Sequence, residues 1–133
     1  MKICVTSLGD SLDSEMDSRF GRCKYFLIID TDSMDVKSIS NDSLMASGGA
    51  GIQAAQMVAK TGADTVITGN VGPNAFQTLK AAGIKVITGV NASIKDVVDK
   101  FNRGELREIE APSVGSHFGM GGTGRGFGRG RNL

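Results

Sequence analysis

The chain has 133 residues, of which 40% are apolar, and a formal net charge of +1. This length is sufficient for one domain with a hydrophobic core that needs no disulfides or structural metal. Two cysteines do not make a secreted disulfide framework and no apolar run is long enough to span a membrane, so we expect a cytoplasmic protein that does not enter a membrane.

The first third of the chain predicts three strands and one long loop. The β-branched run KICVTS at residues 2–7 is typical of a buried strand. Residues 9–23 are polar without a clean period, and such long loops often carry function. Residues 24–31 and 36–41 predict two more strands, which the turn DSMD joins into a hairpin.

The second half of the chain alternates between helices and strands. We expect helices at residues 51–61, 72–83 and 92–106, and strands at residues 64–69 and 84–89. Strands that alternate with helices run parallel, whereas the hairpin adds an antiparallel strand. The order therefore predicts an α/β fold with a five-stranded mixed sheet flanked by about three helices. The loops that follow its parallel strands should gather at one edge, where such sheets bind ligands.

The composition changes near residue 110. We expect an α/β domain at residues 1–110 and a disordered Gly/Arg-rich tail at residues 111–133, because eight of the last 21 residues are glycines. Residues 1–112 carry a net charge of −2, whereas Arg125, Arg129 and Arg131 give the tail +3. The folded part therefore lacks the charge of a nucleic-acid-binding domain, and the tail alone could contact a polyanion.

A glycine cluster opens the first expected helix, in the stretch SGGAGIQAAQ. It contains Gly48, Gly49 and Gly51, but it lacks the Lys-Ser/Thr pair of a P-loop and does not match G-x-G-x-x-G. One interpretation is a sharp turn that only glycine allows. The other is a helix N-terminus whose free N–H groups, including those of Ala50 and Ile52, bind an anion.

The stretch TGNVGPNAF repeats this arrangement before the second expected helix. Its candidate binding residues are Gly69, Asn70, Gly72, Pro73, Asn74 and Ala75. The backbone N–H groups at that helix start would be unpaired. By itself this stretch fits a simple turn better than a binding site, but two glycine-rich helix starts at one edge favour a shared anionic ligand.

The stretch SRFGRCKYF carries cations and a thiol beside the second strand. Arg19 and Arg22 flank Phe20 and Gly21, and arginine suits the pairing of anions. Cys23 lies between two basic residues, which would favour a thiolate for a soft metal. The alternative is that Cys23 is a small buried residue without a ligand role.

The sequence contains none of the common catalytic motifs considered. There is no H-E-x-x-H, no C-x-x-C and no plausible Ser/His/Asp set, so we expect a protein that is not an enzyme. An enzyme would have to use the carboxylates of the loop at residues 9–23. His117 is the only histidine, and in the tail beside Met120 it is either a weak metal ligand or has no such role.

Three segments form a recognisable combination: SRFGRCKYFLIID, SGGAGIQAAQMVAKTGADTVITGNVGPNAFQTLKAAGIKV and FNRGEL. Together they resemble the dinitrogenase iron-molybdenum cofactor biosynthesis family, which includes NifX-like and NifY-like proteins and the C-terminal domain of NifB-like proteins. The resemblance covers about residues 1–109. It implies a ribonuclease-H-like fold and a non-enzymatic role in binding or carrying an anionic metal–sulfur cluster or its precursor, such as a molybdenum–iron or molybdenum–copper sulfide.

On this sequence the family's F-G-R turn is Phe20-Gly21-Arg22, its glycine-rich helix start is Gly48–Gly51, and its second loop is Gly69–Pro73. Many relatives have histidine directly before the turn, whereas this chain has Arg19, which pairs with charge and does not ligate a metal. The implied partners are cluster donor or acceptor proteins, for a monomer or weak dimer. The alternative function is a nucleic-acid or protein-partner adaptor that acts through the Gly/Arg-rich tail.

Overall fold

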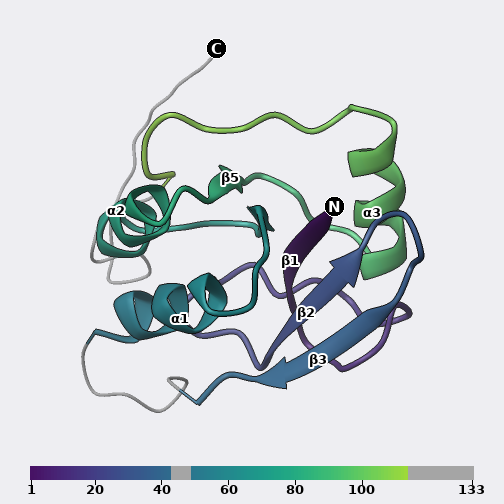
Figure 1. The fold of residues 1–133 in the computed structure, drawn as a ribbon, viewed down its shortest axis with the longest axis horizontal. Coiled ribbons are helices and arrows are strands. Elements are labelled where there is room, and N and C mark those ends of the chain that lie inside the picture. The colour runs from purple at the N-terminus through teal and green to yellow at the C-terminus, as the bar shows by residue number, and fades with distance from the viewer. Residues whose placement is uncertain (43–48, 114–133) are drawn as a thin grey trace.

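The computed structural model describes residues 1–42 and 49–113, which form a mixed sheet with helices on both faces (Figure 1). The strands are β1 (Lys2–Ser7), β2 (Tyr25–Asp30), β3 (Val36–Ser40), β4 (Thr65–Ile67) and β5 (Lys85–Ile87). The helices are α1 (Ala50–Ala59), α2 (Pro73–Ala81) and α3 (Ile94–Asn102). The predicted α/β class with five mixed strands and three helices is confirmed. Gly48, His117 and residues 114–133 lie outside the described residues.

The strand order β3-β2-β1-β4-β5 places the first strand at the centre of the sheet. β1 pairs in parallel with β4, and β4 pairs in parallel with β5. β2 runs antiparallel to both β1 and β3, so β3 points in the same direction as β1. Consequently β1, β3, β4 and β5 all end at one edge of the sheet, and α1 and α2, which follow β3 and β4, both begin there.

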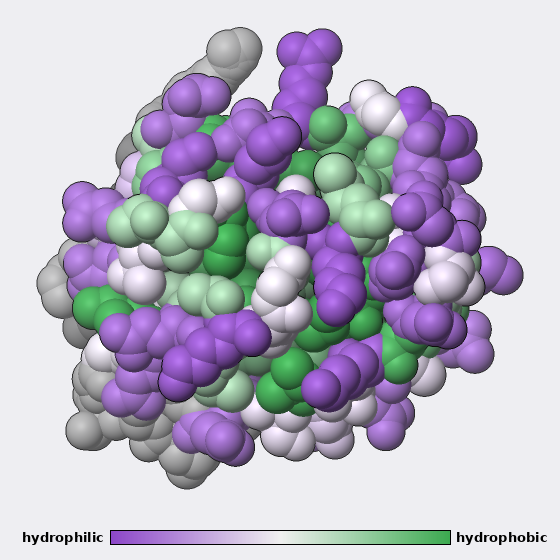
Figure 2. Space-filling model, in the orientation of Figure 1, coloured by the Kyte–Doolittle hydropathy of each residue, from purple (hydrophilic) through white to green (hydrophobic). Residues whose placement is uncertain are grey.

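Alternating side chains of the strands build two separate cores. On one face Cys4, Ile28, Val66 and Val86 pack in a buried cluster with residues of α1 and α2. On the other face Ile3, Val5, Leu27, Ile29, Ile67 and Ile87 pack with residues of α3. Both faces of the central strands are therefore buried, which explains why the sequences of these strands are continuous apolar runs. Outside the cores, hydrophilic residues cover most of the face shown in Figure 2, with smaller hydrophobic patches between them.

The ends of α3 show how local signals set a helix. Its N-cap is Ser93, whose hydroxyl accepts a hydrogen bond of 3.3 Å from the backbone nitrogen of Asp96. The helix ends at Asn102, four residues before the predicted end. The reason is Gly104, whose φ of 73° turns the chain out of the helix one residue after the C-cap at Arg103.

The segment after α3 returns across the open side of β5. The backbone nitrogen of Ile109 donates to the carbonyl of Val86 at 2.8 Å, and Glu108 pairs with Lys80 of α2 at 2.8 Å. The segment then reaches the loop between β4 and α2 at Ser113. Within the described residues, no helix is long and apolar enough to cross a membrane.

Candidate functional site

The loops after β1, β4 and β5 meet at one edge of the sheet, as predicted. The backbone nitrogen of Asn70 donates to the carbonyl of Ser18 at 2.8 Å, and the nitrogen of Phe20 donates back to the carbonyl of Asn70 at 3.3 Å. The nitrogen of Met16 donates to the carbonyl of Ala92 at 3.0 Å. The F-G-R turn is therefore held against the loop that leads into α2.

Glycines allow three backbone segments to touch at this edge. A Cβ atom added at Gly21 would lie 3.0 Å from Cα of Gly51, and one added at Gly51 would lie 3.2 Å from Cβ of Ala75. A Cβ atom at Gly69 would lie 2.7 Å from Cα of Ser18. The F-G-R turn and the starts of α1 and α2 therefore pack so closely that a methyl group at these glycines would require neighbouring atoms to shift.

A cavity of about 330 Å³ lies among these three segments. Its lining residues are Arg19, Phe20, Gly21, Arg22, Gly49, Ala50, Gly51, Ile52, Asn70, Gly72, Pro73, Asn74 and Ala75. All of them are candidate binding residues from the sequence. Among the described glycine candidates, Gly69 is outside the lining and instead packs closely against Ser18. A cavity of this size is within the range of small-ligand sites.

Both helices that open onto the cavity begin without a side-chain cap. The N-cap of α1 is Gly49, with a φ of 71°, and the N-cap of α2 is Gly72. The first intrahelical hydrogen bonds run from the nitrogen of Gln53 to the carbonyl of Gly49, 2.9 Å, and from Phe76 to Gly72, 3.0 Å. By contrast α3, on the other face of the sheet, has the capping side chain of Ser93.

The uncapped helix starts leave five backbone N–H groups at the cavity. They belong to Ala50, Gly51, Ile52, Asn74 and Ala75, and none of them donates a hydrogen bond to another described residue. Such groups at two helix N-termini, together with the two helix dipoles, create a positive potential without any charged side chain. An anion in the cavity would satisfy them.

Arg19 is held in place at this cavity by a buried carboxylate. The Asp17 side chain is 3% exposed and accepts from Nε of Arg19 at 3.2 Å and from Nη2 at 3.4 Å. These hydrogen bonds and the charge of Asp17 raise the pKa of Arg19 above its ordinary value. The Arg19 side chain is nevertheless 56% exposed, so the guanidinium remains accessible to a ligand. Among the described lining residues Arg19 and Arg22 are the charged ones, and no carboxylate lines the cavity.

Cys23 does not fit the role of a metal ligand. It is fully buried, does not line the cavity, and its Sγ donates to the carbonyl of Phe20 at 3.3 Å. Burial raises the pKa of the Cys23 thiol, so the neutral thiol is favoured over the thiolate. The prediction of a favoured thiolate is wrong because burial outweighs the basic neighbours. In the described part of the chain no group of three or more His, Cys, Asp or Glu side chains could hold a metal ion.

Asn41 supports the F-G-R turn from the end of β3. Its side-chain amide donates to the carbonyl of Cys23 at 2.8 Å and to the carbonyl of Gly21 at 3.2 Å. From the sequence, Asn41 is expected only as part of a strand, and Asp17 only as one of the loop carboxylates. No spacing signal identifies either residue, because the partners of Asn41 are far away in the sequence and the burial of Asp17 is decided by the fold.

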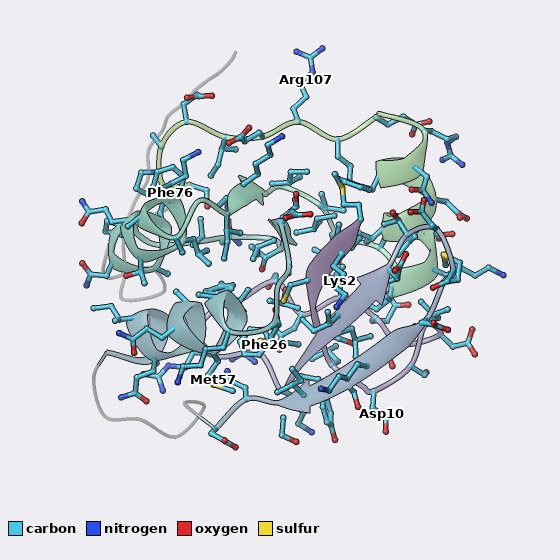
Figure 3. All side chains as sticks on the ribbon, viewed as in Figure 1. Lys2, Asp10, Phe26, Met57, Phe76 and Arg107 are labelled. Carbon is cyan, nitrogen blue, oxygen red and sulfur yellow. The ribbon has the colours of Figure 1, made fainter. Side chains whose placement is uncertain are left out.

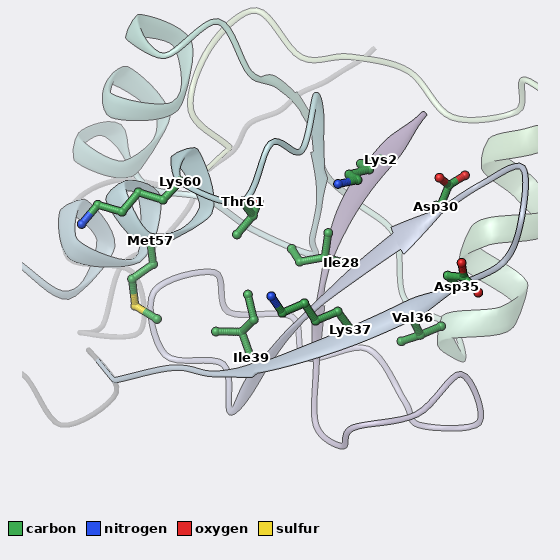
Figure 4. Close-up of a pocket in the computed structure, with 10 residues that line it drawn as sticks. All are labelled: Lys2, Ile28, Asp30, Asp35, Val36, Lys37, Ile39, Met57, Lys60 and Thr61. Carbon is green, nitrogen blue, oxygen red and sulfur yellow. The ribbon is translucent and has the colours of Figure 1, made fainter.

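A larger hollow of about 610 Å³ lies between α1 and β3 (Figure 4). Its charged lining is mixed, with Lys2, Lys37, Lys60, Asp30 and Asp35. Lys60 is the C-cap of α1, so this hollow lies at the negative end of the helix dipole. The smaller cavity, at two positive helix ends and without a carboxylate in its described lining, is the better site for an anion.

Comparisons with known proteins agree with this architecture. The apo form of the orange protein from Desulfovibrio gigas is 41% identical, with a TM-score of 0.83, over 85% of this chain and 96% of that chain. A Thermotoga protein provisionally assigned as NifB is 36% identical, with a TM-score of 0.71, over 80% of this chain and 91% of that chain. An uncharacterized protein of Methanocaldococcus jannaschii is 29% identical over 114 residues, which are 83% of this chain and 97% of the relative.

The family model described as dinitrogenase iron-molybdenum cofactor matches residues 1–104, which include all five strands and all three helices. The match therefore spans the whole sheet and every described segment that lines the cavity. The resemblance carried by the F-G-R turn and the two glycine-rich helix starts is confirmed. The chain belongs to the dinitrogenase iron-molybdenum cofactor family.

Proposed function

We propose that this protein is a non-enzymatic binding or carrier protein for an anionic metal–sulfur cluster or its precursor. The observation that carries the proposal is the convergence of two uncapped helix N-termini and the Asp17-held Arg19 on one cavity. Backbone N–H donors and an arginine can hold an anion without forming a bond to its metal. Cluster donor or acceptor proteins would then be its partners.

The lining of the cavity favours a sulfide-rimmed anion over a nucleotide phosphate. The lysine that follows the glycines of a P-loop is missing, and α1 continues from Gly51 with Ile52 and Gln53. Phe20, Ile52 and Pro73 add apolar surface, which suits the diffuse charge of a metal sulfide better than a compact, strongly hydrated phosphate. A molybdenum–iron or molybdenum–copper sulfide has this chemistry.

The comparisons support the same class of ligand. The family is described by the iron-molybdenum cofactor, and the orange protein of Desulfovibrio gigas was solved as an apo form, which denotes a protein without its bound group. A Thermotoga relative is provisionally assigned as NifB. The adaptor alternative depends on residues 114–133, outside the described residues, and no comparison supports it.

The experiment is an anaerobic reconstitution of the full-length apo-protein. The protein is incubated with tetrathiomolybdate plus copper(I) or iron(II), desalted, and analysed by visible absorption and metal content. We expect a coloured protein with bound molybdenum, and weaker retention in Arg19→Gln. The matched control is Arg107→Gln, which removes the same charge from an exposed side chain that projects away from the body of the molecule (Figure 3). Colourless protein after desalting from every mixture would overturn the proposal.

A further inference from the structure

The sheet has two edges, and the described part of the chain covers one of them. At the β5 edge the segment after α3 bonds to the strand, since the nitrogen of Ile109 donates to the carbonyl of Val86. At the β3 edge, β2 is the one neighbouring strand among the described residues. An edge strand with a single neighbour offers its other row of backbone groups for pairing with another chain.

The pairing of β2 with β3 determines which backbone groups of β3 face away from the sheet. At one end of the pair the nitrogen of Asp30 donates to the carbonyl of Asp35 at 3.0 Å. At the other end the nitrogen of Asn41 donates to the carbonyl of Lys24 at 3.0 Å. In an antiparallel pair every second residue bonds to the neighbouring strand. The residues between them direct their N–H and C=O groups outward; they are Val36, Ser38 and Ser40.

β3 lacks two features that commonly close an edge strand. It contains no proline, and its register with β2 runs from Val36 to Ser40 without a bulge. Lys37 and Ser38 at its centre are exposed. A lysine on an edge strand disfavours pairing with uncharged strands, but it favours a strand that places a carboxylate opposite it.

The hollow between α1 and β3 lies beside this edge and specifies the side chains that an added strand would need (Figure 4). Asp35, Lys37 and Ile39 line it at every second position, so they lie on one face of β3. Buried Ile28 and half-buried Met57 add apolar surface to the same hollow. Within the described residues, neither Asp35 nor Lys37 forms an ion pair. Along β3 the hollow therefore presents an acid, a base and an apolar surface in that order.

We propose that β3 is the docking site for an extended segment of a partner protein, which adds to the sheet as an antiparallel strand. The segment carries an apolar, an acidic and a basic residue at successive second positions, opposite Ile39, Lys37 and Asp35. Opposed side chains on one face of a sheet contact each other, and opposite charges there are favourable. The outward backbone groups of β3 supply affinity, and the hollow supplies specificity. The hollow shares no lining residue with the anion cavity, so this proposal is independent of the proposed function.

A second copy of this chain fits the edge less well than such a segment. Antiparallel registers that overlap at least three residues of two β3 strands, with outward groups opposed, are centred on Lys37, Ser38 or Ile39. They place Lys37 opposite another lysine, Ile39 or Asn41 of the other copy. None of these registers gives Lys37 a directly opposed carboxylate, so the charges favour a different chain.

The test titrates the full-length protein into a fluorescein-labelled peptide, TVTETKT, and follows fluorescence anisotropy at low salt. Its valine, glutamate and lysine would lie opposite Ile39, Lys37 and Asp35, with strand-favouring threonines between them. The control peptide TVTKTET has the same composition, with glutamate and lysine exchanged. We expect the control to bind about 3- to 10-fold more weakly, because it opposes like charges at both positions. In the variant Asp35→Lys/Lys37→Glu the order of the two peptides should be reversed.

N-methylation of the peptide separates strand addition from binding by side chains alone. The threonine between valine and glutamate lies opposite Ser38, so its N–H group faces β3 and donates to it. A methyl group on that nitrogen should weaken binding about 3- to 10-fold, as expected for a lost hydrogen bond. A methyl group on the glutamate nitrogen, which faces away from β3, is the matched control and should leave the affinity close to that of the unmodified peptide.

Four outcomes would overturn the proposal. They are no binding of TVTETKT at millimolar protein, equal affinities of wild type for the two peptides, equal effects of the two methyl groups, and a wild-type dimer in analytical ultracentrifugation that dissociates in Lys37→Glu. The last outcome would assign the edge to a second copy. The peptide comparisons use wild-type protein, so they remain decisive if the double variant does not fold.

Discussion

The backbones of Gly21 and Gly51 are in contact: a Cβ atom at Gly21 would lie 3.0 Å from both the nitrogen and Cα of Gly51. This contact joins the F-G-R turn to the first turn of α1. The glycine cluster had two interpretations, a sharp turn and an anion-binding helix start, and the contact shows that one cluster can serve both. Gly49 makes the turn with its φ of 71°, whereas Gly51 lets the F-G-R turn approach closely and also lines the cavity.

The first prediction concerns this contact. Gly21→Ala should lower the free energy of unfolding by about 1–3 kcal/mol, because its methyl group meets rigid backbone. Gly51→Ala should cost less, because its methyl group meets only the Cβ of Ala75, and alanine is favoured over glycine in a helix by about 1 kcal/mol. Urea unfolding of both variants checks the order. A larger loss for Gly51→Ala would contradict the packing described.

The second prediction concerns the pair of Asp17 and Arg19. A double-mutant cycle with Asp17→Asn and Arg19→Gln should give a coupling energy of about 0.5–1.5 kcal/mol in urea unfolding, a value reduced because the Arg19 side chain is 56% exposed. The cycle of Lys80→Gln and Glu108→Gln is the control. The Glu108 carboxylate is 32% exposed, against 3% for Asp17, so the coupling of the control pair should be smaller. Equal couplings would indicate that Asp17 does not hold the guanidinium.

The third prediction concerns alkaline pH. Burial raises the pKa values of the Cys4 and Cys23 thiols, whereas in the unfolded chain they titrate near about 8.5. Their contribution to stability is complete below that pH and is lost as the pH rises toward the raised folded-state values. The free energy of unfolding should therefore fall above pH ~8.5, by up to about 1.4 kcal/mol per pH unit for each thiol.

The measurement is urea unfolding at several pH values between neutral and alkaline, for wild type and for Cys4→Ala/Cys23→Ala. Other groups titrate in both proteins, so their contributions cancel in the difference. The double variant should be less stable at neutral pH, because two buried side chains are reduced, but its stability should decline less steeply with pH. Parallel curves would mean that the thiols are not protected from ionisation.

The fourth prediction concerns the cap of α3. Ser93→Ala should lower the free energy of unfolding by about 0.5–1 kcal/mol, because the nitrogen of Asp96 loses the hydroxyl that accepts its hydrogen bond. Ser93→Asn keeps an acceptor at the N-cap and serves as the control, with stability close to wild type. Thermal unfolding monitored by circular dichroism compares the three proteins. A loss as large in Ser93→Asn would assign the effect to packing rather than to capping.

The fold could be predicted because its main signals are local. Continuous apolar runs, the hairpin turn and the alternation of helices with strands were sufficient for the five strands and three helices, with bounds that differ mostly by one to three residues. The predicted end of α3 is wrong because Gly104, with its positive φ, stops the helix before Glu105 and Leu106. The ribonuclease-H-like assignment stays a prediction.

The candidate residues could be found because glycines at helix starts and the F-G-R turn are recognisable sequence motifs. The structure brings the described candidates around one cavity, apart from Gly69 and Cys23, while their binding role stays a prediction. For Cys23 the sequence left two interpretations open, a thiolate ligand and a small buried residue, because charged neighbours are visible in a sequence and burial is not; the structure supports the buried residue. Gly48 and His117 lie outside the described residues.

By itself, the sequence determined the elements, their parallel arrangement and the two glycine-rich helix starts, because each depends on neighbours within a few positions along the chain. Only the tertiary structure decided which groups face the cavity and what holds them. Asp17 positions Arg19, Asn41 supports the F-G-R turn, and Ser113 anchors the C-terminal segment to Val71. The pairs of Asn41 with Gly21 and of Ser113 with Val71 join residues far apart in the sequence, so no sequence pattern predicts these contacts. Asp17 and Arg19 are close in sequence, but their pairing matters because the fold buries the carboxylate and leaves the guanidinium exposed.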